Sequence, residues 1–178
     1  ILNHINDHYP KHIVTIEDPI EFIHSDKNSL VTQREVGADT VSFAEALRGV
    51  VRESPDGIFI GETRDIQTIK IAVSAALTGH LVVTTMHTAD IVQSVERVIN
   101  QYPEHLREQA AVDLSLALRA IIAQRLVNRA DGAGRIPALE ILDVTPLARN
   151  IIAKRDFAKL EDVMKRGEEE GMVTFNRY

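Results

Sequence analysis

The stretch Gly57-Ile58-Phe59-Ile60-Gly61-Glu62-Thr63-Arg64-Asp65 decides the fold class of this chain. Its apolar run between two glycines predicts a short buried strand, and Asp65 predicts the N-cap of a helix from Ile66 to Leu77. Similar apolar strands are predicted over residues 12–16 and 81–85. Strands that alternate with helices and are apolar along their length are typical of a mostly parallel sheet covered by helices. The sequence therefore predicts an α/β fold.

The flanking segments supply the remaining elements. Pro10 ends a predicted first helix, and Ser42 predicts the N-cap of a helix that Pro55 closes. Residues 25–40 are polar and are predicted to be irregular. After residue 89 the pattern changes, and it predicts helices over 91–102 and 104–128, a turn over 130–134, a strand over 135–142, a helix from Thr145-Pro146 and a charged helix over 156–169.

Length and composition exclude several classes of protein. The chain has 178 residues, enough for one domain with its own core, and its formal net charge of −6 argues against a binder of the nucleic-acid backbone. The absence of cysteine excludes a disulfide scaffold, a cysteine zinc site and a thiol nucleophile. Residues 71–89 are free of Asp, Glu, Lys and Arg, but they include two histidines and several threonines, so they do not predict a transmembrane helix. No signal peptide is predicted at the start.

Acidic residues follow two of the predicted strands. Glu17, Asp18 and Glu21 come after the first strand, and Glu62 comes after the second. Parallel strands present their carboxyl ends to a ligand, and nucleotide hydrolases use an acid at such a strand end to hold the hydration shell of Mg²⁺ or to polarise a water molecule. A glutamate at a strand end is more commonly a solvated loop residue. Both interpretations stay open for each carboxylate taken singly.

Histidines give weaker signals. The strand over 81–85 ends near Thr85 and His87, so three neighbouring strand ends are predicted to meet at one site. His87 is equally well explained as a core histidine, and His80 after Gly79 as a turn residue.

The spacing of His4, His8 and His12 is that of a metal-binding helix face. Pro10 interrupts this face, so His12 is expected to leave the helix. A metal site is therefore not the favoured interpretation.

Three ordered motifs resemble those of the bacterial secretion ATPase superfamily. Residues 15–21 are similar to its Asp box, residues 60–65 to its Walker B motif, and the stretch from Thr78 to Thr88 to its His box. Residues 33–37 are similar to the segment that joins the first two motifs. The resemblance extends over nearly the whole chain. It implies a RecA-like, mostly parallel sheet with flanking helices, followed by a C-terminal helical region.

Within the superfamily, the chain resembles the type IV pilus retraction ATPases (PilT/PilU-like). Secretion and pilus-extension members commonly have a four-cysteine zinc subdomain after the His box, and this chain has no cysteine. Residues 147–154 partly resemble the C-terminal retraction motif, with matches at Arg149 and Asn150. The resemblance implies that residues 1–142 form the ATPase domain and that residues 143–178 are the C-terminal helical region of the same domain.

The resemblance also implies roles for individual residues. Glu21 would be the general base that polarises the attacking water, Glu17 and Asp18 would support the metal and water network, and Glu62 would be the Walker B acid near Mg²⁺. Four residues would sense the nucleotide phosphates: His80, His87, Thr85 and Arg64. The two histidines would alternatively link neighbouring subunits. Arg149 and Asn150 would couple hydrolysis to retraction.

The implied protein is a homo-hexameric motor that hydrolyses ATP with Mg²⁺ to drive pilus retraction in twitching motility. It would act at the cytoplasmic face of the inner membrane, peripherally, with the platform proteins of the pilus machine as partners. No nucleic-acid partner and no dedicated protein metal site are expected. Two alternatives stay open: a noncatalytic paralogue that modulates the motor ring, and a related type II secretion or pilus assembly ATPase. A DNA-packaging or conjugation motor is disfavoured by the acidic charge.

The phosphate-binding loop of the family does not occur in this sequence. A Walker A motif requires Gly-x-x-x-x-Gly-Lys-Ser/Thr, because backbone N–H groups and the lysine hold the phosphates. None of the six lysines here follows a glycine. In the family this loop precedes a helix that matches residues 1–8. We therefore expect the sequence to be a segment of a longer polypeptide that begins within the P-loop helix, lacks the P-loop strand and is inactive by itself.

Overall fold

The computed structural model describes residues 1–177, except for the side chain of Arg177. The chain divides into two compact units, one from Ile1 to Met86 and one from His87 onward. The boundary expected after residue 142 lies inside the last strand of the second unit.

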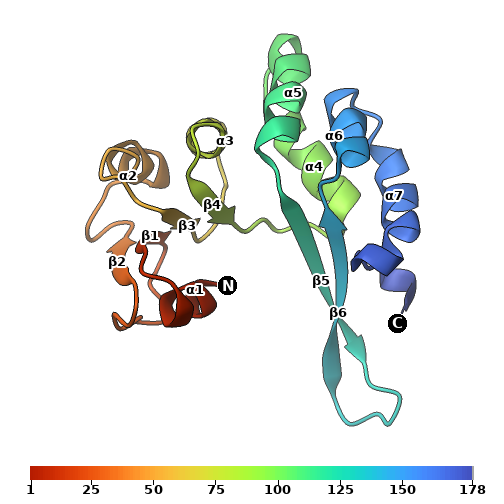
Figure 1. Ribbon diagram of the computed structural model, residues 1–178, viewed down its shortest axis with the longest axis horizontal. Coiled ribbons are helices and arrows are strands. Elements are labelled where there is room, and N and C mark those ends of the chain that lie inside the picture. Colours follow the sequence, from red (N-terminus) through yellow and green to blue (C-terminus); the bar gives the residue numbers. More distant parts are fainter. Residues whose placement is uncertain (178) are drawn as a thin grey trace. The chain divides into compact units, whose positions relative to one another are not determined.

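The first unit is built on a parallel sheet (Figure 1). The sheet has the order β2-β1-β3-β4, and its strands are β1 (His12–Glu17), β2 (Leu30–Glu35), β3 (Gly57–Ile60) and β4 (Leu81–Thr84). Each neighbouring pair is parallel, with Ile16 opposite Ile60 and Ile60 opposite Thr84. The predicted α/β fold class is confirmed.

Helices cover both faces of this sheet. The helices α2 (Phe43–Val50) and α3 (Ile66–Leu77) lie on one face, and α1 (Leu2–His8) lies on the other (Figure 1). The core between the sheet and the pair α2 and α3 is almost wholly aliphatic, and its fully buried members are Val14, Ile16, Leu47, Val50 and Ile58. Burial of this apolar surface is the main force that holds the layers together.

The two predicted N-caps are confirmed. The Ser42 hydroxyl accepts a hydrogen bond from the Glu45 N–H at 3.2 Å, and Asp65 Oδ1 accepts from the N–H groups of Gln67 at 2.8 Å and Thr68 at 2.9 Å. Burial acts to raise the pKa of Asp65, but the hydrogen bonds from Thr68 and Gln67 outweigh it, so this pKa lies below its ordinary value. These caps fix where α2 and α3 begin after the strands that precede them.

The strand β2 corrects the expectation that residues 25–40 are irregular. It pairs in parallel with β1, from Leu30 opposite His12 to Glu35 opposite Glu17. Its residues after Leu30 are all half-buried. Its sequence, Leu-Val-Thr-Gln-Arg-Glu, does not alternate apolar and polar residues, so no local pattern marks it as a strand. The strand forms because it completes the backbone hydrogen bonds of β1, which is a tertiary and not a local effect.

The second unit packs helices against an antiparallel hairpin (Figure 1). Its longer elements are α4 (Ile91–Asn100), α5 (Arg107–Ala117), β5 (Ala120–Asn128), β6 (Arg135–Asp143), α6 (Pro146–Ala153) and α7 (Leu160–Arg166). Short 3-10 turns lie at Glu104–Leu106, Phe157–Lys159, Glu168–Glu170 and Phe175–Arg177. Within residues 1–177, no helix is long and apolar enough to span a membrane.

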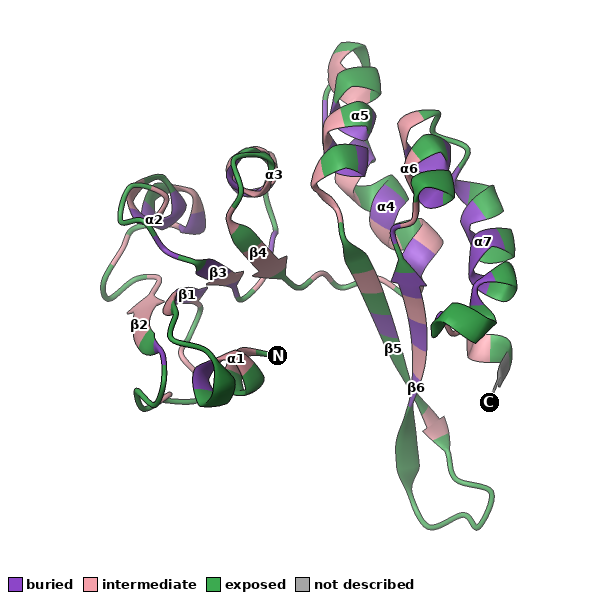
Figure 2. Cartoon of the chain, viewed as in Figure 1, coloured by how far each residue is buried: buried purple, intermediate pink, exposed green. Residues whose placement is uncertain are grey.

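The helix predicted over residues 104–128 is wrong in its second half. The helix α5 ends at Ala117, and β5 then pairs with β6 along its whole length. The apolar residues of β5 are distributed over both faces of the strand. Two of them, Ile121 and Ile122, are β-branched residues, which favour strands. The predicted turn over 130–134 closes the hairpin, whose far end is exposed (Figure 2).

The charged helix predicted over residues 156–169 is also shorter than expected. The helix α7 ends at Arg166, and the chain turns at Gly167. A Cβ added to Gly167 would lie 2.5 Å from the Sδ atom of Met172, which is 1% exposed. A glycine at this position leaves room for the buried Met172 side chain.

Candidate active site

The predicted acidic residues gather at the carboxyl edge of the parallel sheet. Because β1, β3 and β4 run in the same direction and in register, their carboxyl ends lie side by side. Glu17 is the last residue of β1, Glu62 lies two residues beyond β3, and Thr85 directly follows β4. This is the edge where an open α/β sheet binds its ligand.

Backbone hydrogen bonds tie these three strand ends together. The Gly61 N–H donates to the Ile16 carbonyl at 2.7 Å, and the Thr63 N–H donates to the Thr85 carbonyl at 3.1 Å. The Thr85 hydroxyl donates in return to the Gly61 carbonyl. A Cβ added to Gly61 would lie 3.3 Å from the Ile16 oxygen, so glycine permits β1 and the chain after β3 to approach closely.

Arg64 joins the two acidic motifs. Its guanidinium forms an ion pair with the Glu62 carboxylate, and its Nη1 lies 3.8 Å from Asp18 Oδ2. The hydrogen bond to Glu62 and the negative charge of that group, with a further contribution from Asp18, raise the pKa of Arg64. The structure therefore brings Asp18, Glu62 and Arg64 together. We call Glu17, Asp18, Glu62 and Arg64 the carboxylate cluster.

Glu17 is oriented by two hydrogen bonds within the fold. Its Oε1 accepts from the Thr15 hydroxyl at 2.6 Å and from Gln33 Nε2 at 3.0 Å. The sequence did not indicate the bond to Gln33, because Gln33 lies in β2, a strand that local patterns do not reveal. The resemblance of residues 33–37 to the segment between the two acidic motifs was the available signal.

Glu21 lies apart from the cluster. It is exposed and lies in an irregular segment after β1. In the part of the chain that the structure describes, no hydrogen bond or ion pair joins its side chain to Arg64, the cation of the cluster. The preceding residues are held by β2, since Glu35 Oε2 accepts a hydrogen bond from the Ile20 N–H at 3.0 Å.

The structure does not bring His80 to the carboxylate cluster. His80 directly precedes β4, so it lies at the amino edge of the sheet, opposite the carboxylates. Its Nδ1 lies 3.1 Å from the Ala75 carbonyl oxygen, and its side chain lines a groove of about 730 Å³ with Tyr9, Lys11 and Asp56. The expected role of His80 in phosphate sensing beside the carboxylates has no geometric support, because His80 and the carboxylates lie at opposite ends of β4.

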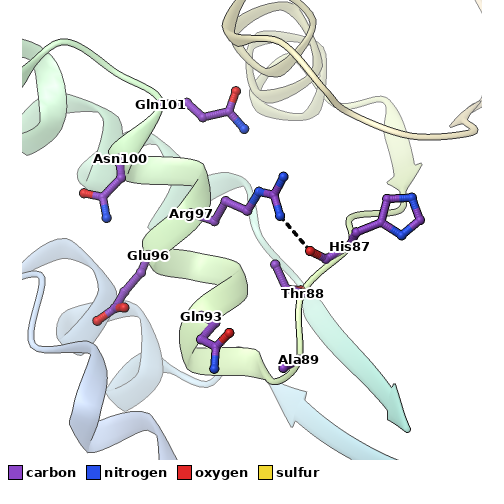
Figure 3. A pocket seen from close by; sticks show the side chains of 8 residues that line it. All are labelled: His87, Thr88, Ala89, Gln93, Glu96, Arg97, Asn100 and Gln101. Carbon is purple, nitrogen blue, oxygen red and sulfur yellow. Dashed lines mark hydrogen bonds between the residues drawn. The ribbon is translucent and has the colours of Figure 1, made fainter. Parts of the chain in front are cut away.

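His87 is the first residue of the second unit, so it is not among the residues that the first unit brings together. Its carbonyl oxygen accepts a hydrogen bond from Arg97 Nη1 at 2.7 Å (Figure 3). Both residues line a groove of about 690 Å³ along the polar face of α4, and Figure 3 shows the amides of Gln93 and Asn100 along the same helix.

Arg149 and Asn150 also belong to the second unit, in α6. Arg149 is half-buried, and its Nε donates to the Val144 carbonyl at 3.4 Å, whereas Asn150 is exposed. The exposed face of α6 also includes Leu147, which is 50% exposed. A partner protein can reach this face of the isolated unit.

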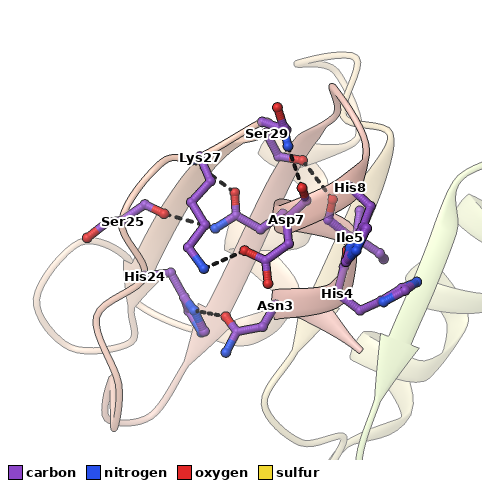
Figure 4. A network of polar contacts seen from close by, with 11 residues as sticks. Asn3, His4, Ile5, Asp7, His8, His24, Ser25, Lys27 and Ser29 are labelled. Atoms are coloured by element: carbon purple, nitrogen blue, oxygen red, sulfur yellow. Dashed lines mark hydrogen bonds and ion pairs between the residues drawn. The ribbon is translucent and has the colours of Figure 1, made fainter.

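The histidines of the first helix are separated from His12. His4 and His8 stack at 4.5 Å between ring centroids, while His12 lies in β1, as the break at Pro10 predicts. Figure 4 shows the neighbouring network, in which the Lys27 ammonium pairs with Asp7. Within residues 1–177, no three His, Asp or Glu side chains converge to hold a metal ion directly. The oxygen donors of the carboxylate cluster fit Mg²⁺, which keeps several of its water ligands in proteins.

Comparison with known proteins identifies relatives that agree with one another in family. The family described as "Type II/IV secretion system protein" matches residues 1–169. The chain is 43% identical to "Twitching motility protein" of Neisseria gonorrhoeae, over 99% of this chain and 47% of that protein. It is 45% identical to "Type IV pilus ATPase PilU" of Pseudomonas aeruginosa, over 99% of this chain and 46% of that protein.

Solved structures agree with these sequence relatives. "Crystal Structure of the Pilus Retraction Motor PilT and Bound ADP" matches with a TM-score of 0.86 at 40% identity, over 97% of this chain and 53% of that chain. The Legionella pneumophila ATPase DotB matches with a TM-score of 0.81 at 26% identity, over 97% of this chain and 52% of that chain. The chain thus spans about half the length of the relatives that it matches.

Proposed function

Since this chain belongs to the type II/IV secretion system protein family, we propose that it is part of a motor that hydrolyses ATP to drive type IV pilus retraction. The observation that supports this proposal is the carboxylate cluster, in which Arg64 joins the Asp box residue Asp18 to the Walker B residue Glu62. The names of the relatives, which include a twitching motility protein, a pilus ATPase and a pilus retraction motor, support it independently.

In this proposal, the carboxylates of the cluster hold the metal ion and its water, and Thr85 supports the strand ends. Glu62 and Asp18 would hold Mg²⁺ through its water ligands, and Mg²⁺ would neutralise charge on the phosphates when it is bound. Glu17, oriented by Thr15 and Gln33, would support the same water network. Thr85 would keep the ends of β3 and β4 in register through its bond to the Gly61 carbonyl.

Glu21 would be the general base that orients the attacking water. Its side chain is exposed and lies three residues beyond Asp18, so it is able to turn toward a nucleotide bound at the cluster. Apo structures commonly show catalytic groups before their final hydrogen bonds form.

The assembly and its location are further parts of the proposal. We infer a homo-hexamer at the cytoplasmic face of the inner membrane, with platform proteins of the pilus machine as partners and ATP and Mg²⁺ as ligands. Arg149 and Asn150 on the accessible face of α6 would couple hydrolysis to retraction. His87, and His80 at the amino edge of the sheet, would lie toward neighbouring subunits.

The test is made on the full-length protein, because the 178 residues include no Walker A motif. Glu62→Gln and Glu21→Gln should each lower ATP turnover by about 10²-fold or more while leaving nucleotide binding nearly intact. Glu104→Gln, at an exposed glutamate in the second unit, is the control and should retain full turnover. Parental turnover in both site variants would overturn the assigned roles.

A second candidate is a noncatalytic paralogue that modulates a motor ring, and it would be favoured if the full-length protein has no Walker A motif. Titration of the full-length protein with a fluorescent ATP analogue separates the two. Saturable Mg²⁺-dependent binding with turnover supports the motor, whereas ring incorporation without nucleotide binding supports the paralogue.

A further inference from the structure

The side-chain amide of Gln33 joins the carboxylate cluster to residues 20–24, which we call the Glu21 segment. Its Nε2 donates hydrogen bonds to Glu17 Oε1 at 3.0 Å and to the Phe22 carbonyl at 2.9 Å. Its Oε1 accepts from the His24 N–H at 2.7 Å. One bond of this amide thus reaches the cluster, and two reach the Glu21 segment.

The register of β2 explains how its side chains reach both places. Gln33 and Glu35 are two residues apart in β2, and Glu35 lies opposite Glu17 of β1. Side chains two residues apart along a strand share one face of the sheet, so Gln33 and Glu35 lie on the face that Glu17 occupies. Glu35 Oε2 accepts a hydrogen bond from the Ile20 N–H at 3.0 Å. The two side chains of β2 therefore hold the backbone on both sides of Glu21.

Burial does not hold the Glu21 segment in place. Phe22 is 63% exposed and Ile23 is 82% exposed, so neither apolar side chain packs into the core. An exposed irregular segment with few apolar contacts opens readily unless hydrogen bonds restrain it. The bonds from Gln33 and Glu35 supply such restraint at residues 20, 22 and 24.

The chain beyond the Glu21 segment is anchored separately to α1 (Figure 4). Asn6, which is 1% exposed, donates from its Nδ2 to the Ser25 carbonyl at 2.9 Å. Its Oδ1 accepts from the Lys27 N–H at 3.1 Å. Loss of the Gln33 amide should therefore loosen the Glu21 segment and leave residues 25–27 in place.

The three partners of Gln33 require an amide. A carboxylate and a carbonyl only accept hydrogen bonds and a backbone N–H only donates one, so the group between them needs two donors and an acceptor. An ionised glutamate would have no donor and would add a negative charge beside Glu17. The pairing of β2 with β1 uses backbone groups, so it does not by itself explain a glutamine at this position.

We propose that Gln33 is a positioning residue that holds the backbone around Glu21 in a fixed relation to Glu17. The Glu21 side chain then turns toward a ligand at the cluster from a restrained backbone. The role of Gln33 is indirect, because it acts through Glu17 and Glu21. Its kinetic consequence rests on the proposed ATPase function, in which Glu21 is the general base, whereas the anchoring of the Glu21 segment does not.

The kinetic test compares Gln33→Met with the parent in the full-length protein. Gln33→Met should lower kcat by about tenfold or more and leave KM for MgATP within about twofold, because the general base loses its alignment while the nucleotide contacts stay. Gln33→Glu keeps the length of the side chain but not its donors, and it should lose kcat to a similar extent.

The matched control is Arg34→Met, which removes an ion pair with Glu53 at 2.7 Å from the opposite face of the same strand. This variant perturbs β2 without removing a bond to the Glu21 segment, so its kcat should stay within about twofold of the parent. Equal losses of kcat in Gln33→Met and Arg34→Met would show that Gln33 only stabilises the strand.

Hydrogen–deuterium exchange at single-residue resolution separates this inference from the proposed function. The His24 N–H should exchange about tenfold or more faster in Gln33→Met than in the parent, while the Lys27 N–H, which Asn6 holds, should be unchanged. If exchange follows this pattern and the parent does not hydrolyse ATP, the proposed function fails and the anchoring by Gln33 stands.

Two results would overturn the inference: unchanged exchange of the His24 N–H in Gln33→Met, or parental kcat in a folded Gln33→Met. If Gln33→Met does not fold, Gln33→Asn, whose amide is one methylene shorter, is measured in its place against the same criteria.

Discussion

At the scale of single residues, Arg64 is the group on which the carboxylate cluster depends. Two acidic strand ends placed side by side repel each other, and a cation between them offsets that repulsion. Arg64 contacts the Glu62 carboxylate and lies 3.8 Å from Asp18, while its own side chain stays 63% exposed. Such an exposed arginine contributes little to folding, so its position is better explained by chemistry at the site.

Arg64→Ala should therefore separate activity from stability. In the full-length protein we expect ATP turnover to fall at least tenfold, because Asp18 and Glu62 lose their common partner, while the urea midpoint stays unchanged. The matched control is Arg129→Ala, which removes an exposed ion pair with Asp131 at the end of the hairpin. Equal turnover in the two variants would show that Arg64 is only a surface residue.

Glu140 is a second residue whose environment has a measurable consequence. It is 7% exposed, and its Oε2 accepts a hydrogen bond from the Ile91 N–H at 2.9 Å. Burial raises the pKa of Glu140 above the ordinary value of 4.5, against the lowering effect of the Ile91 N–H. The folded protein thus binds the proton of the Glu140 carboxyl group more tightly than the unfolded chain does.

The sign of the resulting pH dependence follows from linkage. A raised acid pKa stabilises the fold below the unfolded value, and this stabilisation is lost as pH rises through the folded pKa. We expect Glu140→Gln to remove that loss, so its free energy of unfolding should improve relative to the parent as pH rises above about 4.5. Urea titrations of both proteins between mildly acid and neutral pH measure the difference. Asp143→Asn, at an exposed carboxylate of the same strand, is the control, and an equal trend in it would contradict the assignment.

At the scale of elements, helix caps were the most reliable local signals. The helix α3 begins and ends where Asp65 and the apolar run predict, since the Asp65 carboxylate accepts N–H groups that would otherwise lack partners. The strands β2 and β5 were missed because pairing with β1 and β6 decides their conformation. Local sequence patterns do not record such pairing.

The cap of α3 supports a quantitative prediction. Asp65→Ala should destabilise the first unit by about 1 kcal/mol, because two N–H groups of the first turn lose their acceptor. Asp65→Asn keeps a good capping side chain and should cost only a fraction of that amount. Chemical denaturation monitored by circular dichroism compares them, and equal losses would indicate that charge, and not capping, stabilises this end.

At the scale of the whole molecule, the net charge of the chain argues against a nucleic-acid substrate for the proposed motor. The formal net charge is −6, and the candidate active site itself is rich in carboxylates. A DNA-translocating motor binds phosphates through many basic side chains, and its affinity falls steeply with salt. The chain offers no such excess of positive charge.

We therefore expect no measurable retention of duplex DNA by the full-length protein at about 0.15 M salt. A gel-shift titration over a range of salt concentrations checks this, with a basic DNA-binding protein as the positive control. Binding that weakens by orders of magnitude between low and high salt would favour a DNA motor over a pilus motor.

The division of the chain into two units is also a property of the whole molecule. The resemblance implied one domain whose C-terminal helical region begins at residue 143, and the contacts divide the chain after residue 86. Residue 142 lies within β6, and its partner strand β5 keeps the segments on either side of that boundary in one unit.

Periodicity, capping and strand ends are local properties of the chain, so the residue pattern alone predicts the parallel sheet, the caps of α2 and α3 and the acids at the ends of β1 and β3. Three further facts come from the packing of distant segments: Arg64 joins Asp18 to Glu62, Gln33 orients Glu17, and His80 lies at the opposite edge. These facts depend on strand direction, register and burial between segments distant in the sequence, which no local pattern specifies.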